Sequence, residues 1–266
     1  MDLLVTVDAH YLQPLTVMLT SLHLAAPADH WHVWVLHRSL NDAQVADLTA
    51  RALRWGWQLS AIQVDAAHFE APKTTKRYPQ EMYYRLLCGE LLPVSVKKVI
   101  YLDPDILVLH SLKPLWRKRL AGHLFAAATH SGFTDMINDL NRVRLNQDHG
   151  YYNSGVLVID VAKARQQIKL TDINQALRQY ERQLWLPDQD LLNLLYGDQV
   201  LPLDEQRYNY DARKFLGYYT RSHGKHDMPW VMAHTAILHF CGSAKPWQSG
   251  HDTRFTALYL NYLNRL

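Results

Sequence analysis

The sequence predicts an α/β protein with a mainly parallel central sheet flanked by helices. Short apolar runs rich in β-branched residues occur at 3–7, 31–36 and 59–64, and such runs are typical of buried strands. The segments between them, 14–25 and 41–55, carry apolar residues at helical spacing. Strands that alternate with helices form βαβ units, in which the strands are parallel and the helices cover the sheet.

The rest of the chain extends this pattern. Asn41 has the residue type of a helix N-cap, and Pro93 is expected to end a helix that begins at Gln80. Further strands are predicted at 97–102, 123–128, 153–160 and 232–240, and further helices at 172–183, 188–196 and 252–264. No repeat or low-complexity linker divides the chain, so we expect one domain over residues 1–266.

Composition excludes several classes of protein. The chain has 266 residues, of which 48% are hydrophobic and 20% are charged, so it can form a large core and is not a charge-rich disordered chain. A net charge of +3 is too small to indicate a nucleic-acid partner. The two cysteines form no Cys-x-x-Cys pair, the start does not resemble a signal peptide, and no apolar run is long enough to span a membrane. These features favour a soluble cytoplasmic protein.

Two carboxylates directly follow the predicted strand at 97–102. Asp103 and Asp105 are two residues apart, and in an extended stretch their side chains would point the same way. Oxygen ligands of this kind suit Mg²⁺ or Mn²⁺. The alternative is a turn at the end of a strand, because Asp-Pro-Asp is also ordinary turn chemistry.

Other polar residues could reach the same place. In open parallel sheets ligands bind beyond the carboxyl ends of strands, where Asp8 and Tyr11 follow the first strand. Asp8 could equally be a helix N-cap. Near the C-terminus, His239 could complete a metal site, Gly242 could let the backbone approach a phosphate, and Lys245 could neutralise its charge. Each of these three also has a purely structural interpretation.

Seven segments taken together resemble glycosyltransferase family 8, which includes retaining bacterial galactosyltransferases and glucosyltransferases that use UDP-sugars, and glycogenin. The segments occur in the family's order across nearly the whole chain, and the bacterial lipopolysaccharide galactosyltransferase type is the nearest in character. They are Val5-Thr6-Val7-Asp8-Ala9-His10-Tyr11, Tyr84-Arg85-Leu86, Tyr101-Leu102-Asp103-Pro104-Asp105, Tyr152-Asn153-Ser154-Gly155-Val156, Leu186-Pro187-Asp188-Gln189-Asp190, Tyr208-Asn209 and 239–247.

The resemblance implies a single GT-A domain, a Rossmann-like nucleotide-diphospho-sugar transferase fold. Its nucleotide-binding part would be about 1–110, and its donor-sugar and acceptor part about 111–266. The implied activity is Mn²⁺-dependent transfer of glucose or galactose from a UDP-sugar, with retention by front-face attack assisted by the leaving diphosphate. Mg²⁺ is the alternative cation. The acceptor would be a saccharide, lipid-linked or protein-linked glycan in cell-surface glycan synthesis.

The resemblance also assigns site residues. Asp103, Asp105 and His239 would hold the cation. The donor nucleotide and sugar would be bound by Asp8, His10, Tyr11, Arg85, Asp103, Asp105, Asn153, Gly242 and Lys245. Asp188 and Gln189 would bind the hydroxyls of the donor sugar as residues of the catalytic centre, and Asp190 would have a supporting role there. Asp188 is also expected to be a helix N-cap after Pro187.

This sequence departs from the family at two positions. His10 stands where the family often has Asn, and His130 stands near a place where the family commonly has Asp. The loop at 70–80 is expected to fold over the donor, and the segment 135–150 to face the acceptor. The C-terminal helix is expected to pack against the body, with a membrane-surface contact or a homo-oligomer face as alternatives. The location would be cytoplasmic, at the inner face of the membrane if the acceptor is lipid-linked.

Two rival functions remain. A sugar-nucleotide nucleotidyltransferase also uses paired carboxylates after a strand, but it would carry a Gly-rich phosphate loop after the first strand, where this chain has Asp8-Ala9-His10-Tyr11. A non-catalytic nucleotide-sugar binding protein would not need the full set Asp103, Asp105, His239 and Lys245.

Overall fold

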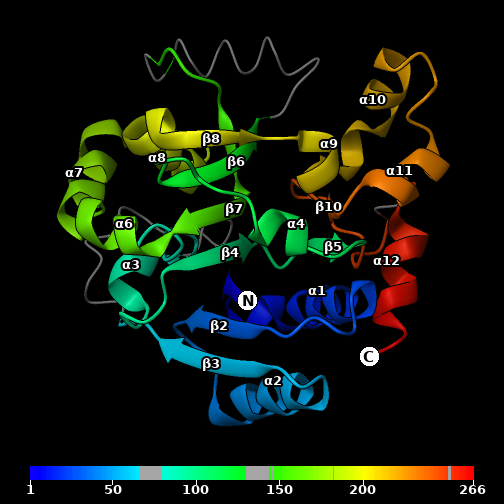
Figure 1. Ribbon diagram of the computed structural model, residues 1–266, viewed down its shortest axis with the longest axis horizontal. Helices are drawn as coiled ribbons and strands as arrows, with labels where there is room; N and C mark the ends of the chain where they lie inside the picture. The colour runs from blue at the N-terminus through cyan, green and yellow to red at the C-terminus, as the bar shows by residue number, and fades with distance from the viewer. Residues whose placement is uncertain (66–79, 130–143, 145–146, 182, 251–252) are drawn as a thin grey trace.

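The computed structural model describes residues 1–65, 80–129, 144, 147–181, 183–250 and 253–266, and it confirms the α/β fold (Figure 1). Its seven-stranded sheet has the order β3-β2-β1-β4-β7-β6-β8. The strands are β1 Asp2–Thr6, β2 His32–His37, β3 Gln58–Gln63, β4 Lys98–Leu102, β6 Phe125–Thr129, β7 Tyr152–Asp160 and β8 Val200–Leu203. The first four strands in this order are parallel, and only β7 runs antiparallel to its neighbours.

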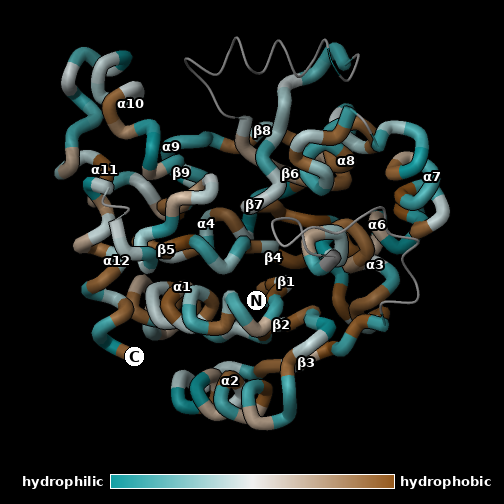
Figure 2. The backbone as a smooth tube through the Cα atoms, turned by 180° about the vertical axis from the view of Figure 1, so that it is seen from behind, coloured by the Kyte–Doolittle hydropathy of each residue, from teal (hydrophilic) through white to brown (hydrophobic). Residues whose placement is uncertain are grey.

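Side chains alternate across the central strands, so the sheet has an apolar core on each face. Leu4 and Tyr101 pack on one face, whereas Leu3, Val5 and Ile100 pack on the other, and all five are fully buried. Helices α1 Leu12–Ala25 and α2 Asp42–Arg54 cover one face. Helices α3 Cys88–Leu91, α6 Val161–Gln167, α7 Leu170–Tyr180 and α8 Pro187–Tyr196 cover the other. Figure 2 shows the apolar strands between these helices from behind.

A second, three-stranded sheet lies beside the first. It has the order β5-β10-β9, formed by Ile106–Val108, Ile237–His239 and Tyr210–Asp211. Short helices α10 Phe215–Arg221 and α11 Met228–His234 lie between β9 and β10, whereas α4 Lys113–Trp116 and α9 Glu205–Tyr208 lie on the connections between the two sheets. Helix α12, Thr256–Leu263, lies against α1, and its buried Tyr259 ring packs on Phe240, which confirms the expected packing of the C-terminal helix against the body.

The structure corrects two predicted elements. Residues 80–92 do not form one helix: a 3₁₀ turn at Gln80–Tyr83 and helix α3 are separated by turns, because the Arg85 side chain points inward and its Nε donates to the Met82 carbonyl (2.8 Å). Residues 228–234 are helical, and the predicted strand at 232–240 is reduced to Ile237–His239. Asp227 caps this helix by accepting from the Trp230 N–H (2.9 Å).

Other expectations fall partly outside the described residues. The predicted loops at 70–80 and 135–150 lie mostly outside the described residues, and His130 also lies outside them. Both cysteines are buried, and they do not form a disulfide bond with each other. Within the described parts of the chain, no helix is both long and apolar enough to cross a membrane.

The predicted N-cap at Asn41 is a reciprocal capping box. Asn41 Oδ1 accepts from the Gln44 N–H, and Gln44 Oε1 accepts from the Asn41 N–H, each at 2.9 Å. We expect Asn41→Ala to lower the free energy of unfolding by about 1 kcal/mol, because the N-terminal amide of α2 loses its acceptor. Urea denaturation would measure this loss, and Asn41→Asp, which keeps an acceptor, should stay near wild type. Equal stability of the alanine variant and wild type would contradict the assignment.

Candidate functional site

A cleft of about 490 Å³ opens at the carboxyl ends of β1 and β4. This is the edge of the sheet at which open α/β proteins bind ligands. Its lining includes eight of the predicted site residues, which are Asp8, Tyr11, Arg85, Asp103, Asp105, Asp188, Gly242 and Lys245. The structure therefore brings together segments that are up to 237 residues apart in the chain (245 minus 8).

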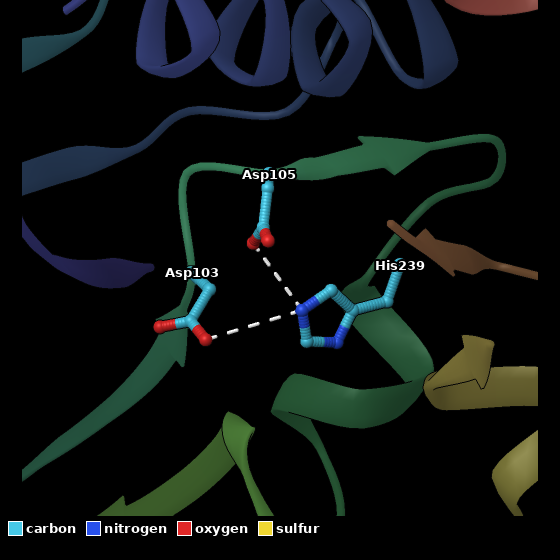
Figure 3. A group of neighbouring side chains, drawn as sticks. All are labelled: Asp103, Asp105 and His239. Atoms are coloured by element: carbon cyan, nitrogen blue, oxygen red, sulfur yellow. Dashed lines mark ion pairs between the residues drawn. The ribbon is translucent and has the colours of Figure 1, made fainter. Parts of the chain in front are cut away.

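Asp103, Asp105 and His239 converge on one point beside this cleft (Figure 3). One potential ligand atom from each lies within 4.8 Å of the others. His239 Nε2 is 3.2 Å from Asp105 Oδ1 and 3.9 Å from Asp103 Oδ2. The pairing of the second sheet explains the convergence: β10 runs antiparallel to β5 with His239 opposite Ile106, which places the imidazole next to Asp105.

The imidazole of His239 is held by a chain of amides. Its Nδ1 lies 2.8 Å from Asn209 Oδ1, and Asn209 Nδ2 donates to Asn153 Oδ1 (2.8 Å). Because Asn209 Oδ1 can only accept, this network assigns the proton of neutral His239 to Nδ1. A proton on Nε2 would face Asp105 Oδ1 (3.2 Å), and once Nε2 is deprotonated its lone pair points toward both carboxylates, as in metal-binding histidines that are oriented by a second hydrogen bond.

Asp103 has one oxygen occupied and one directed toward His239. Its Oδ1 accepts from the Tyr101 hydroxyl (2.6 Å) and lies 3.0 Å from Arg85 Nη1. Tyr101 is fully buried, and burial raises the pKa of its hydroxyl well above its ordinary value, so the hydroxyl remains a donor. Asp103 Oδ2 is the atom that faces His239. The carboxylate is therefore oriented with one oxygen left for a ligand.

Asp105 is buried and ionised. One oxygen, Oδ2, is paired with the ammonium of Lys245, while Oδ1 lies 3.2 Å from His239 Nε2 and has no donor besides that imidazole among the described residues. Burial raises the pKa of this carboxyl, but the charges of Lys245 and His239 outweigh burial and hold it well below its usual range. When His239 Nε2 is deprotonated, Asp105 Oδ1 has no hydrogen bond, which is costly for a buried carboxylate unless a ligand contacts it. Together with Asp103 Oδ2 and His239 Nε2, Asp105 Oδ1 forms a donor set that fits a divalent cation.

Gly155 keeps the space between these ligands open. A Cβ atom at this position would lie 2.4 Å from His239 Cε1 and 2.6 Å from Asp103 Oδ2, so a side chain cannot be accommodated without displacing both. The Gly155 carbonyl also accepts from the Asp103 N–H (2.8 Å). The sequence offered Gly155 and Asn209 only as members of motifs, and their roles become visible once the strands are paired.

Arg85 is the central cation of the other half of the cleft. Its Nη1 donates to the Ser154 carbonyl (2.8 Å) and lies 3.3 Å from Asp188 Oδ2, and the guanidinium stacks on the Tyr101 ring. Asp188 Oδ2 also accepts from the Ser154 hydroxyl (2.8 Å). The expectation that Asp188 is a helix N-cap is wrong, since α8 begins after Leu186 and Asp188 lies inside its first turn, pointing at Arg85.

Gln189 and Asp190 follow on the same helix and face different neighbours. Gln189 Oε1 accepts from Asn153 Nδ2 (2.9 Å), which joins it to the amide chain behind His239. Asp190 is fully buried and does not line the cleft. Its carboxylate accepts from Arg144, from the Tyr151 hydroxyl (2.6 Å) and from the main-chain N–H groups of Trp185 and Leu186. The structure thus gives Asp190 contacts that anchor the start of α8.

The remaining predicted residues lie at the cleft's rim. Asp8 is the N-cap of the 3₁₀ turn Ala9–Tyr11, because its Oδ1 accepts from the N–H groups of His10 (2.9 Å) and Tyr11 (3.1 Å). Asp8 and Tyr11 also line the cleft, whereas His10 is exposed and does not. Gly242 adopts φ +88°, a left-handed conformation that favours glycine.

Comparison with known proteins agrees with this geometry. The model of the family described as Glycosyl transferase family 8 matches residues 2–250. General stress protein A of Bacillus subtilis (strain 168) is 27% identical over 237 residues, which cover 87% of this chain and 82% of that protein. Lipopolysaccharide 1,2-glucosyltransferase of Escherichia coli (strain K12) is 24% identical over 247 residues, covering 91% of this chain and 71% of that protein.

Solved structures show the same fold. The galactosyltransferase LgtC, in complex with donor and acceptor sugar analogs, superposes with a TM-score of 0.84 at 25% identity, covering 100% of this chain and 96% of that chain. The glycosyltransferase GlyE of Streptococcus pneumoniae TIGR4 has a TM-score of 0.73 at 20% identity and covers 98% of this chain and 59% of that chain. The seven-stranded sheet is thus the sheet of a GT-A fold, and this chain belongs to glycosyl transferase family 8.

Proposed function

We propose that this enzyme transfers a hexose, glucose or galactose, from a UDP-sugar to a hydroxyl of a saccharide or glycoconjugate, with Mn²⁺ as its cofactor. The observation that carries the proposal is the convergence of Asp103, Asp105 and His239 beside a cleft at the carboxyl edge of the sheet. The names of the relatives support the class of reaction, since they include a lipopolysaccharide glucosyltransferase and a galactosyltransferase solved with sugar analogs.

The charges of the cleft suit a leaving diphosphate. A divalent cation held by Asp103 Oδ2, Asp105 Oδ1 and His239 Nε2 would supply Lewis-acid stabilisation of the departing UDP. Lys245 and the backbone around Gly242 line the same cleft and would contact the phosphate oxygens. Mg²⁺ is the alternative cation, because the donor set contains two carboxylates and a single imidazole.

The donor's other parts would occupy the two ends of the cleft. Asp8 and Tyr11, which line the cleft, would bind the uracil and its ribose, with the exposed His10 next to them in the chain. Arg85 and Asp188 offer a fixed cation and a fixed acceptor to the sugar, and Asn153 and Gln189 lie behind them. Sugar recognition needs several donors and acceptors at fixed angles, which this hydrogen-bonded group supplies.

Retention by front-face attack fits the positions of the carboxylates. A double displacement needs a carboxylate nucleophile on the face of the sugar opposite the leaving group. Asp190 is buried away from the cleft with its oxygens occupied, and Gln189 carries an amide. Asp188 lines the cleft, but its Oδ2 is engaged by Arg85 and by the Ser154 hydroxyl. In the front-face route the leaving diphosphate accepts the proton of the acceptor hydroxyl, so no further protein base is required. We propose a lipid-linked or protein-linked glycan as the acceptor, reached from the cytoplasmic side of the membrane.

We expect Asp103→Asn to reduce Mn²⁺-dependent release of UDP from a UDP-hexose by at least about 100-fold, because the neutral amide weakens both the cation site and the stabilised leaving group. Released UDP would be measured directly. Asp47→Asn, a change of the same kind on the exposed face of α2, is the matched control and should keep full activity. Unchanged turnover in Asp103→Asn would contradict the metal assignment.

UDP is expected to raise the melting temperature only when Mn²⁺ is present. At a ligand concentration about 100 times Kd the stabilisation is about 2.7 kcal/mol, which corresponds to about 5 °C for a chain of this size. Gly155→Ala should abolish the shift, because its Cβ would displace His239 and Asp103. Equal shifts in Mn²⁺ and in EDTA would show that the cation does not bridge UDP to the protein.

A donor screen separates this function from its rivals. UDP-glucose or UDP-galactose should give slow UDP release without acceptor and faster release with a glycan acceptor, while UDP-N-acetylglucosamine should give neither. A nucleotidyltransferase would instead form UDP-sugar from UTP and a sugar phosphate. A non-catalytic binding protein would bind the donors without releasing UDP.

A further inference from the structure

Lys245 pairs with the carboxylate that a divalent cation at this site would also contact, through the other of its two oxygens. The lysine side chain is only 8% exposed, and its ammonium is paired with Asp105 Oδ2 while it donates to the Phe240 carbonyl (2.9 Å). Asp105 is one of the three residues that could hold the cation. The same carboxylate therefore pairs with the lysine in this structure and would bind the metal in the donor complex.

We propose that Lys245 is a built-in counterion that competes with the divalent cation for Asp105 and is released toward the diphosphate when the cation binds. This inference rests on the proposed function. It assigns Lys245 a second role in addition to phosphate contact: the lysine sets the order and the coupling of metal and nucleotide binding.

Charge balance gives the reason for the competition. Arg85 lies between Asp103 and Asp188 and pairs with both. Among the described residues, the lysine or arginine that forms an ion pair with Asp105 is Lys245. Without a cation, removing that ammonium would leave a buried carboxylate with only the His239 imidazole beside it, 3.2 Å from its other oxygen. With a doubly charged cation on Asp105, an ammonium at hydrogen-bond distance from the same carboxylate is repelled strongly.

The two basic side chains differ in how firmly they are held. Arg85 is tied at both ends of its guanidinium, by the carbonyls of Met82 and Ser154 and by two carboxylates. The Lys245 ammonium has a flexible four-carbon stem and, besides Asp105, a single carbonyl partner. Lys245 also lines the cleft next to Gly242 and Ser243, so its ammonium can turn toward a bound phosphate without leaving the protein surface.

Coupling between the two ligands follows. The cation alone must displace Lys245 from Asp105 with no new partner for the ammonium, so it binds weakly. When a diphosphate is present, the displaced ammonium gains phosphate oxygens, so the two ligands bind cooperatively. By linkage, the cation must strengthen diphosphate binding by the same factor.

The test is the affinity for Mn²⁺ in the absence of nucleotide, measured from the electron paramagnetic resonance signal of free Mn²⁺. We expect Lys245→Met to bind Mn²⁺ at least about tenfold more tightly than wild type, because the competitor is gone and the cation relieves an uncompensated carboxylate. The same variant should bind UDP more weakly than wild type when Mn²⁺ is saturating. These opposite changes separate competition from simple damage to the site.

Two control variants accompany this measurement. Lys98→Met removes another partly buried lysine, at the opposite end of β4 from Asp103. Its ammonium donates to the carbonyls of Trp116 and Lys118, and the substitution should leave Mn²⁺ affinity unchanged. Lys245→Arg keeps the charge and should keep weak Mn²⁺ binding. If Lys245→Met destabilises the protein, Mn²⁺ should raise its melting temperature more than it raises that of wild type.

The outcomes are distinguishable. Equal or weaker Mn²⁺ binding by Lys245→Met, with wild type still binding Mn²⁺ in the presence of UDP, would overturn the competition and leave the proposed function intact. Failure of wild type to bind Mn²⁺ even with UDP would overturn the metal assignment, and the competition with it. Tighter Mn²⁺ binding in Lys98→Met as well would show that the effect is general and would also overturn the competition.

Discussion

Repulsion among three carboxylates in one small cleft is the constraint on which the rest of the site depends. Asp103, Asp105 and Asp188 all line the cleft, and each lies within 3.3 Å of a basic nitrogen. In a partly desolvated site such charges are tolerated only when each is matched by an opposite charge or a hydrogen bond. Arg85 matches two of them at once, and this requirement breaks the chain at 80–92 into turns instead of one helix.

The topology of two sheets delivers the histidine to these carboxylates. Parallel pairing in the first sheet brings β1 and β4 side by side, so Asp8 and Asp103, which follow these strands, lie at the same carboxyl edge of the sheet. The chain then turns through Asp105 into β5, which leaves the first sheet and pairs antiparallel with β10. His239 thus reaches Asp105 by main-chain hydrogen bonding, including the bond from the Phe240 N–H to the Asp105 carbonyl (3.0 Å). The site depends on strand pairing over more than 130 residues.

Sequence patterns predicted the parts of the molecule that local rules determine. Buried strands and the Asn41 cap follow from periodicity and capping chemistry, and they appear within about two residues of the expected places. The predicted strand at 232–240 began too early, because residues 232–234 belong to the helix Met228–His234 that Asp227 caps. Gly155 and Asn209 could not be assigned roles, because each acts on His239 through contacts that exist only after folding. The motifs included these two residues but did not indicate what their side chains or backbone contact.

Asp188 and Asp190 show that the residue type alone does not determine the role of a side chain. Both are aspartates in the first turn of α8, two residues apart, and both are buried. Residues at i and i+2 of a helix point to different sides, so one carboxylate reaches Arg85 in the cleft and the other turns back to the N–H groups of Trp185 and Leu186. The second contact satisfies the open amides at the start of the helix, and that in turn positions the first. A carboxylate outside the cleft therefore supports the one inside it, and this division of roles follows from helix geometry alone.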